Sequence, residues 1–430
     1  MAIIFWMIRK FNFYKLPGLG PWHPTLAFAL KLAAAAMLWV VYTRYYGHRD
    51  SNDAFRYFDD AMVIRGLWNE NREYFFRYMF GFGLEDPALA VINDKLHCWT
   101  ASYSYGLTHD GQTMIRLNVL IGFLSGGHYA VHTLIMCLFS FTGLVALYRT
   151  FHRWLTVHPL VLFTACFVLP SVLFWSSGVL KEAPLLFVFG LFVWHFTMLI
   201  HRFEMWRLLL TLVLFAASFY LKEYVIIAFI PGLFFYVLMR WVPVRYPLLM
   251  WMVVLLACFL VASNAGYFFS GGDFLYVLAK KQGAFISVAE MVDAGSLVWV
   301  PPVTDAWHYV LNYPHALALA YLRPMPWEAH SAIMWAAALE NLLYVAILVL
   351  VIVRFRKPDK SQVPFLLTIL SFVIVLGGII GAVVPILGAV VRYRIVALPF
   401  LVVVCASCIR PWSTTVFEAW RGVKKAPVEQ

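Results

Sequence analysis

Long apolar segments separated by short polar connections make up most of this chain. About ten segments are apolar enough to cross a bilayer, although several are shorter than the ~20 residues that an upright helix needs. These segments are 25–43, 127–147, 158–175, 183–200, 207–221, 224–239, 246–265, 332–353, 363–386 and 395–409. The pattern predicts an all-α integral membrane protein in which residues 1–430 form one polytopic domain with about ten transmembrane helices.

Two polar stretches, 44–116 and 266–331, are too long to be turns between spans. The short connections elsewhere carry lysine and arginine with few acids, which is typical of the cytoplasmic side of a membrane. If both termini are cytoplasmic, the two long stretches become extracytoplasmic loops. Aromatic residues interleaved with charged ones in the first loop predict helices that lie in the membrane interface, and we expect the same in the second.

The segment that follows the first predicted span is rich in aspartate. Its four aspartates are Asp50, Asp53, Asp59 and Asp60. On a helix, Asp53 and Asp60 share one face, and Arg56 and Tyr57 lie between them on that face. Neighbouring apolar positions predict an interfacial helix whose acids face water or a cleft. The same acids could instead be only the polar face of that helix.

Composition supports a membrane protein. Of the 430 residues, 63% are hydrophobic and 13% are charged, whereas a soluble domain carries about 25% charged residues. The mean hydropathy is +0.77. The net charge of +11 is explained by cations that anchor the cytoplasmic side, so the sequence indicates no nucleic-acid partner.

Charged pairs also lie between predicted spans on the outer side. Lys181 is followed by Glu182, and Lys222 is followed by Glu223. Adjacent residues on a helix do not face one another. We therefore expect each of these residues to find its partner elsewhere or to lie in the interface. Lys181 and Lys222 are then either functional residues or anchors.

Arginines provide candidate phosphate contacts. Arg392 and Arg394 lie on the predicted outer side, against the cytoplasmic trend, and a guanidinium matches phosphate geometry with two parallel hydrogen bonds. Arg323 precedes a Pro-Met-Pro-Trp stretch, which could form a rim over a headgroup site or an aromatic anchor. Glu340 would lie about half-way down a span, where a carboxylate is a candidate functional group.

Part of the first loop resembles a known family. Asp53-Ala-Phe-Arg56-Tyr57, with Ala61 following, resembles the D-x-x-R-Y…A motif of bacterial membrane glycosyltransferases of the GT-C superfamily. The closest group is that of the dolichyl-phosphate-mannose mannosyltransferases and aminoarabinose-transferase-like enzymes. Asp94-Lys95 with Trp99 resembles that group's D-K-P-P-L-x-x-W segment, without its two prolines, and Arg116-Leu117 resembles its next landmark. The resemblance covers about residues 50–120.

The resemblance implies transfer of a sugar from a polyprenyl-phosphate donor to a glycan or lipid acceptor on the outer face of the membrane. Asp53 would activate the acceptor as a general base, and Lys95 would contact phosphate. Asp60 and Asp59 are the next candidate catalytic residues. The candidate substrate-binding residues are Arg56, Tyr57, Asp94, Lys95, Lys181, Lys222, Arg323, Arg392 and Arg394.

No cofactor is certain, although the paired carboxylates of Asp59 and Asp60 could hold a divalent cation. The setting that fits is a bacterial plasma membrane, with a role in assembling envelope glycans or glycolipids. All of the polar clusters fall on one predicted side, which suits an outward-facing site.

Two other functions remain open. A polysaccharide-repeat polymerase or ligase would use an oligosaccharide on polyprenyl pyrophosphate. A transporter or lipid flippase would favour discontinuous helices and internal repeats.

Overall fold

The computed structural model describes residues 1–46, 49, 52–99, 109–242, 245–267, 273–291 and 295–410; Asp50 lies outside these ranges. Helices account for 79% of the structure, and the described residues contain no β-strand. The all-α prediction is therefore confirmed.

Nineteen α-helices are assigned in the described ranges. They are α1 (Ala2–Lys10), α2 (His23–Val40), α3 (Asp53–Glu70), α4 (Arg72–Phe80), α5 (Ala90–Asn93), α6 (Asp110–Ser125), α7 (Tyr129–Trp154), α8 (Pro159–Phe163), α9 (Pro170–Trp175), α10 (Glu182–His201), α11 (Met205–Trp241), α12 (Pro247–Ser263), α13 (Phe274–Met291), α14 (Ala306–Leu311), α15 (Tyr313–Leu322), α16 (Ala332–Val353), α17 (Val363–Val383), α18 (Leu387–Tyr393) and α19 (Leu398–Cys408).

Six helices in the described part of the chain are long and apolar enough to cross a membrane. They are α2 with its π-helical extension to Tyr45, α7, α10, α11, α16 and α17. They indicate a multi-pass integral membrane protein. A seventh crossing is formed if α18 and α19, which meet at a 66° bend, make one span. The predicted number of about ten is not confirmed.

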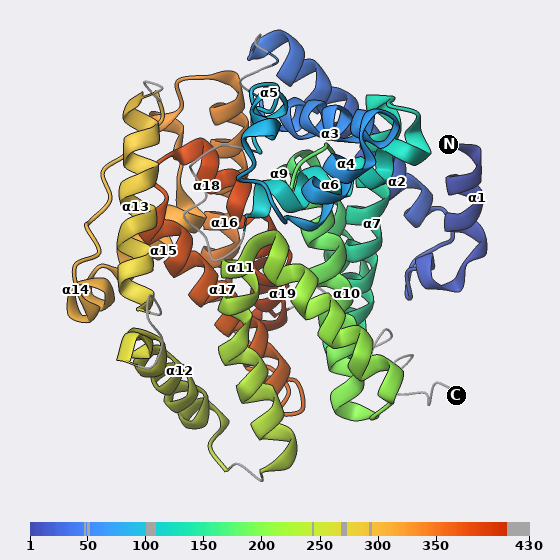
Figure 1. The fold of residues 1–430 in the computed structure, drawn as a ribbon. Helices are drawn as coiled ribbons and strands as arrows, with labels where there is room; N and C mark the ends of the chain where they lie inside the picture. Colours follow the sequence, from blue (N-terminus) through green and yellow to red (C-terminus); the bar gives the residue numbers. More distant parts are fainter. Residues whose placement is uncertain are drawn as a thin grey trace.

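Fewer than ten spanning helices are found among the described residues because several of the predicted spans are bent or short helices in the structure. The predicted spans 207–221 and 224–239 are one element, α11, whose backbone leaves helical geometry at Lys222 (φ −157°, ψ 93°). Figure 1 shows the two arms of α11 meeting at this bend. The predicted span 158–175 is divided into α8, a π-helical turn and α9, because Pro170 begins a new helix. Helix α12 has only 17 residues.

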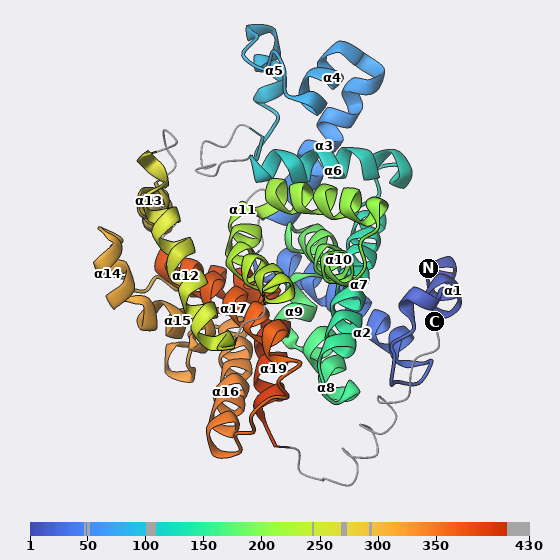
Figure 2. The same cartoon turned by 90° about the horizontal axis from the view of Figure 1, so that it is seen from below.

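The long helices pack side by side in the order α7, α10, α11 and α17, and α15 packs on the far side of α17. Helices α3 to α5, from the first predicted loop, and α6, which begins in that loop, gather at one end of this group (Figure 1). Figure 2 shows α4 and α5 projecting beyond α3 and α6. Helix α12 lies at the edge of the molecule, where Val254 is its one buried residue. Its exposed apolar side chains, among them Leu248, Leu249, Met252 and Leu256, are available for contact with lipid.

Two glycines allow α7 and α10 to approach closely. A Cβ atom added to Gly143 would lie 1.9 Å from the carbonyl oxygen of Leu186, and one added to Gly190 would lie 2.3 Å from the carbonyl oxygen of Gly143. Small residues at such crossings are typical of packing between membrane helices. The crossing matters for the candidate site, because α10 begins at Glu182.

We predict that Gly143→Ala lowers the thermal stability of the purified protein, because the added methyl group would separate α7 from α10. Overpacking of this kind costs about 1–3 kcal/mol. The matched control is Gly66→Ala in the interior of α3, where the new methyl group meets no atom within 4 Å. That variant should be as stable as the wild type or gain up to about 1 kcal/mol. A Gly143→Ala variant with wild-type thermal unfolding in detergent would contradict the crossing.

Candidate functional site

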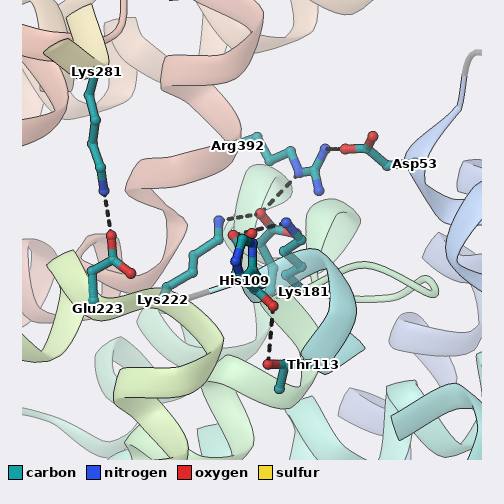
Figure 3. A network of polar contacts seen from close by, with 10 residues as sticks. Asp53, His109, Thr113, Lys181, Lys222, Glu223, Lys281 and Arg392 are labelled. Atoms are coloured by element: carbon teal, nitrogen blue, oxygen red, sulfur yellow. Dashed lines mark hydrogen bonds and ion pairs between the residues drawn. The ribbon is translucent and has the colours of Figure 1, made fainter. Parts of the chain in front are cut away.

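A network of ion pairs centred on Arg392 joins four distant segments. The Nε of Arg392 donates to Glu182 Oε1 at 3.0 Å, and its Nη1 donates to Asp53 Oδ2 at 2.9 Å (Figure 3). Lys222 Nζ donates to the same Glu182 oxygen at 2.8 Å. We call Arg392, Asp53, Glu182 and Lys222 the Arg392 network.

Each member of the network comes from the end or the bend of a helix. Asp53 is the first residue of α3, and Glu182 is the first residue of α10. Acidic side chains in the first turn interact favourably with the positive end of a helix dipole. Lys222 lies at the bend in α11, and Arg392 is in the last turn of α18. The bend therefore brings the Lys222 ammonium to the start of α10.

Two further ion pairs flank the Arg392 network. Lys181 Nζ lies 2.8 Å from Asp110 Oδ2, at the start of α6. Lys281, on α13, pairs with Glu223. Lys181 and Glu182, like Lys222 and Glu223, thus turn to different partners. The expectation that these neighbours pair elsewhere is confirmed.

Aromatic rings surround the cations. Lys222 Nζ lies 4.3 Å from the centroid of the Tyr393 ring, and Lys181 Nζ lies 5.2 Å from the centroid of Tyr57. A cation over the face of such a ring is attracted by the ring's quadrupole. Tyr57, a predicted substrate-binding residue, is itself buried. Its ring packs against the Lys181 ammonium.

The two cations of the Arg392 network, Arg392 and Lys222, balance the charges of its two anions, Asp53 and Glu182. Lys222 and Glu182 are 5% and 0% exposed, and buried charges of this kind persist only when they are paired. Asp53 differs, because 40% of its side-chain surface is accessible. Burial would raise the pKa of the Asp53 carboxyl, but the charges of Arg392 and Lys181 outweigh that effect and hold the pKa below its ordinary value. Asp53 is therefore an ionised carboxylate that solvent can reach.

Lys181 also remains charged. Burial would lower the pKa of its ammonium, but the charge of Asp110 and its hydrogen bond outweigh burial and raise the pKa above the ordinary value. The site thus presents accessible negative charge at Asp53 next to fixed positive charges.

Asp60 lies elsewhere and binds backbone. Its Oδ1 accepts from the His97 N–H at 2.8 Å, and its Oδ2 accepts from the N–H groups of Cys98 and Trp99 at 2.7 and 3.0 Å. Arg56 Nη2 donates to the His97 carbonyl at 2.6 Å. Asp60 is fully buried. Asp60 and Arg56, both on the predicted acidic face, thus fix the segment 97–99 to α3, and neither side chain takes part in the Arg392 network.

Asp59 is paired with Arg49 through both carboxylate oxygens, at 2.6 and 2.8 Å. Asp59 and Asp60 are therefore turned to different partners. Within the described ranges, no group of three or more histidine, cysteine, aspartate or glutamate side chains could hold a metal ion. The geometry gives no support to a cation site at Asp59 and Asp60.

The remaining predicted residues are not joined to the Arg392 network by any ion pair or hydrogen bond among the described residues. Asp94 and Lys95 are exposed just after α5. Arg323 pairs with Glu328 at 2.7 Å through its Nε. These three residues stay predictions as substrate contacts.

Arg394 is fully buried and is turned to protein acceptors. Its Nη1 donates to the carbonyls of Ala320 and Arg323 at 3.0 Å each, and its Nη2 donates to Asn341 Oδ1 at 2.5 Å. The guanidinium thus holds the end of α18 against the end of α15 and the middle of α16. A phosphate contact by Arg394 has no support from this geometry.

Glu340, the carboxylate expected within a span, accepts hydrogen bonds from the backbone and hydroxyl of Ser171, at 3.0 and 2.9 Å, and from the Tyr344 hydroxyl. Three donors satisfy this buried carboxylate. It joins α9 to α16.

Four residues of the site were not predicted as site residues from the sequence: Asp110, Glu182, Glu223 and Lys281. Glu182 and Glu223 had a signal, because each follows a lysine between predicted spans. Asp110 is a lone acid before the apolar run of α6, and no motif marks it.

Comparison of the chain with models of known protein families, with curated proteins and with solved structures gives no match.

We predict that Asp60→Asn lowers thermal stability strongly, because the amide nitrogen of asparagine cannot accept the backbone N–H groups of residues 97–99. Hydrogen bonds to a charged group contribute about 1.5–3 kcal/mol each. Asp59→Asn should change stability by less than about 1 kcal/mol, because its pair with Arg49 is largely exposed. Thermal unfolding of both variants in the same detergent provides the measurement. Equal stabilities would show that Asp60 does not hold the segment.

Proposed function

We propose that this protein is a membrane glycosyltransferase that moves a sugar from a polyprenyl-phosphate donor to a glycan or lipid acceptor. The observation that carries the proposal is the pairing of Asp53, an accessible carboxylate, with the largely buried guanidinium of Arg392. Such a transfer needs a base for the acceptor hydroxyl and a cation for the phosphate that leaves. Both groups are present in one site, and Asp53 also carries the resemblance to the GT-C motif.

The donor phosphate and the Asp53 carboxylate compete for Arg392, so donor binding changes the basicity of Asp53. With Arg392 beside it, Asp53 is a weak base, because the ion pair holds its pKa below the ordinary value. A donor phosphate that binds the Arg392 guanidinium and the Lys181 ammonium displaces the Asp53 carboxylate. The freed carboxylate, no longer paired, becomes a stronger base at the same position.

The reaction then proceeds by displacement at the anomeric carbon. The acceptor oxygen forms a bond to this carbon while its proton passes to Asp53 Oδ2. The bond between the anomeric carbon and the phosphate oxygen breaks, and the electron pair stays with the phosphate. Arg392 and Lys181 take up the charge that develops on the leaving group.

We place this site on the outer face of a bacterial plasma membrane, with both termini in the cytoplasm. In support of this orientation, the short connections carry lysine and arginine with few acids, as cytoplasmic connections do. The starts of α3 and α10, the bend of α11 and the end of α18 all meet in the Arg392 network. If the two arms of α11 cross separately, the bend lies on the same side as the first loop. The protein would then act in the assembly of envelope glycans or glycolipids.

A transporter of lipid-linked sugars is the second candidate. The bend at Lys222 and the 66° bend between α18 and α19 are the discontinuous helices that such proteins use at their binding sites. Transport leaves the donor intact, whereas transfer consumes it.

We predict that Asp53→Asn lowers sugar transfer by about 10²–10⁴-fold, because an amide cannot accept the acceptor proton. The assay is consumption of a polyprenyl-phosphate hexose by the purified protein in liposomes. Donor affinity should be kept or increased, because a neutral amide competes for Arg392 less strongly than a carboxylate does.

Asp59→Asn is the matched control, since it removes one carboxylate from the same helix without touching the Arg392 network. It should retain transfer. Full transfer by Asp53→Asn would contradict the assignment of the base. Movement of intact donor across the bilayer without consumption would favour the transporter.

A further inference from the structure

One oxygen of Glu182 is buried without a hydrogen-bond donor. Its Oε1 accepts from both Arg392 and Lys222, whereas its Oε2 has no partner within the described structure. The side chain is fully buried, and no residue that the structure describes donates a hydrogen bond to this oxygen. A buried polar atom of this kind is costly unless another molecule supplies the missing hydrogen bond.

A second polar atom without a partner belongs to the same site. The hydroxyl of Tyr224, two residues beyond the bend of α11, is buried and makes no hydrogen bond to the residues that the structure describes. The Tyr224 ring lies beside Lys222, whose Nζ is 5.8 Å from the ring centroid and donates to Glu182 Oε1 at 2.8 Å. One unpaired acceptor and one unpaired donor thus belong to one site.

The charges around Glu182 Oε2 and the Tyr224 hydroxyl limit which chemical group can hydrogen-bond to both of them. A phosphate oxygen is repelled by the Glu182 carboxylate, and it cannot donate the hydrogen bond that Oε2 needs. A metal cation or an ammonium group is repelled by Arg392 and Lys222, which already bind Oε1. A neutral hydroxyl group fits, because it can donate to Glu182 Oε2 and accept from the Tyr224 O–H.

We infer that Glu182 Oε2 and the Tyr224 hydroxyl form a recognition point for one hydroxyl group of the transferred sugar. This inference rests on the proposed function, since it places the sugar next to the phosphate site at Arg392. The two oxygens of Glu182 then have different roles. Oε1 pairs with the cations of Arg392 and Lys222, and Oε2 accepts a hydrogen bond from the sugar. A site built to bond a hydroxyl discriminates against analogues that lack it.

The test uses the full chain in nanodiscs, with Tyr224→Phe as the variant, because it removes the hydroxyl and keeps the ring beside Lys222. Two probes are compared by titration: a panel of polyprenyl-phosphate hexoses, and polyprenyl phosphate without a sugar. We expect Tyr224→Phe to weaken binding of a hexose-bearing lipid by about five- to tenfold. Binding of the sugar-free lipid should stay unchanged.

Thermal stability without ligand gives an independent measurement. Tyr224→Phe removes a hydroxyl without a partner, so its melting temperature should equal or exceed that of the wild type. The matched control is Tyr321→Phe, which removes a hydroxyl that donates to the Val373 carbonyl at 2.6 Å and should lower the melting temperature.

The outcomes separate this inference from the proposed function. If the wild type binds a hexose-bearing lipid and Tyr224→Phe binds it equally well, the recognition point is wrong and these atoms are satisfied by water only, while the proposed function stands. If Tyr224→Phe weakens the binding of both lipids equally, the Tyr224 hydroxyl does not recognise the sugar. If the wild type binds neither lipid, the proposed function and the recognition point fall together.

Discussion

The ion pairs of Arg392 hold together parts of the chain that are far apart in sequence. One guanidinium binds Asp53 and Glu182, which precede it by 339 and 210 residues. Because Glu182 is fully buried and Arg392 is nearly so, loss of either partner would leave an uncompensated charge in a medium of low dielectric constant. The arrangement of α3, α10, α11 and α18 therefore depends on these contacts being made together.

A second set of buried polar contacts, made by Arg394 and Glu340, stabilises the Arg392 network. Arg394 is two residues from Arg392 and is fixed by two carbonyls and by Asn341, while the neighbouring Glu340 is fixed by Ser171 and Tyr344. The Arg394 contacts attach the end of α18 to α15 and α16, and the Glu340 contacts attach α9 to α16. Together they give the Arg392 side chain a rigid base. The close crossing of α7 and α10 at Gly143 does the same for Glu182. The site is thus built on helix ends that are fixed by packing deeper in the molecule.

The sequence predicted the helices well and their continuity less well. Apolar runs mark helices reliably, and the break between the predicted spans 207–221 and 224–239 coincides with the bend at Lys222. No local pattern, however, indicates that the Lys222 ammonium pairs with Glu182. Adjacent charges were correctly expected to pair elsewhere. The partners were out of reach, because Asp110 and Glu182 approach Lys181 and Arg392 only once the helices pack. Asp60 was predicted as a catalytic residue and Arg394 as a phosphate contact, whereas the structure buries both and gives them partners within the protein.

A double-mutant cycle on Asp53→Asn and Arg392→Gln tests the central claim most directly, with thermal unfolding of the four proteins in one detergent as the readout. If the two side chains form the pair described here, the effects of the single variants will be non-additive, with a coupling energy of at least about 1 kcal/mol. Additivity within about 0.5 kcal/mol would contradict the pair, and with it the arrangement of the site around Arg392.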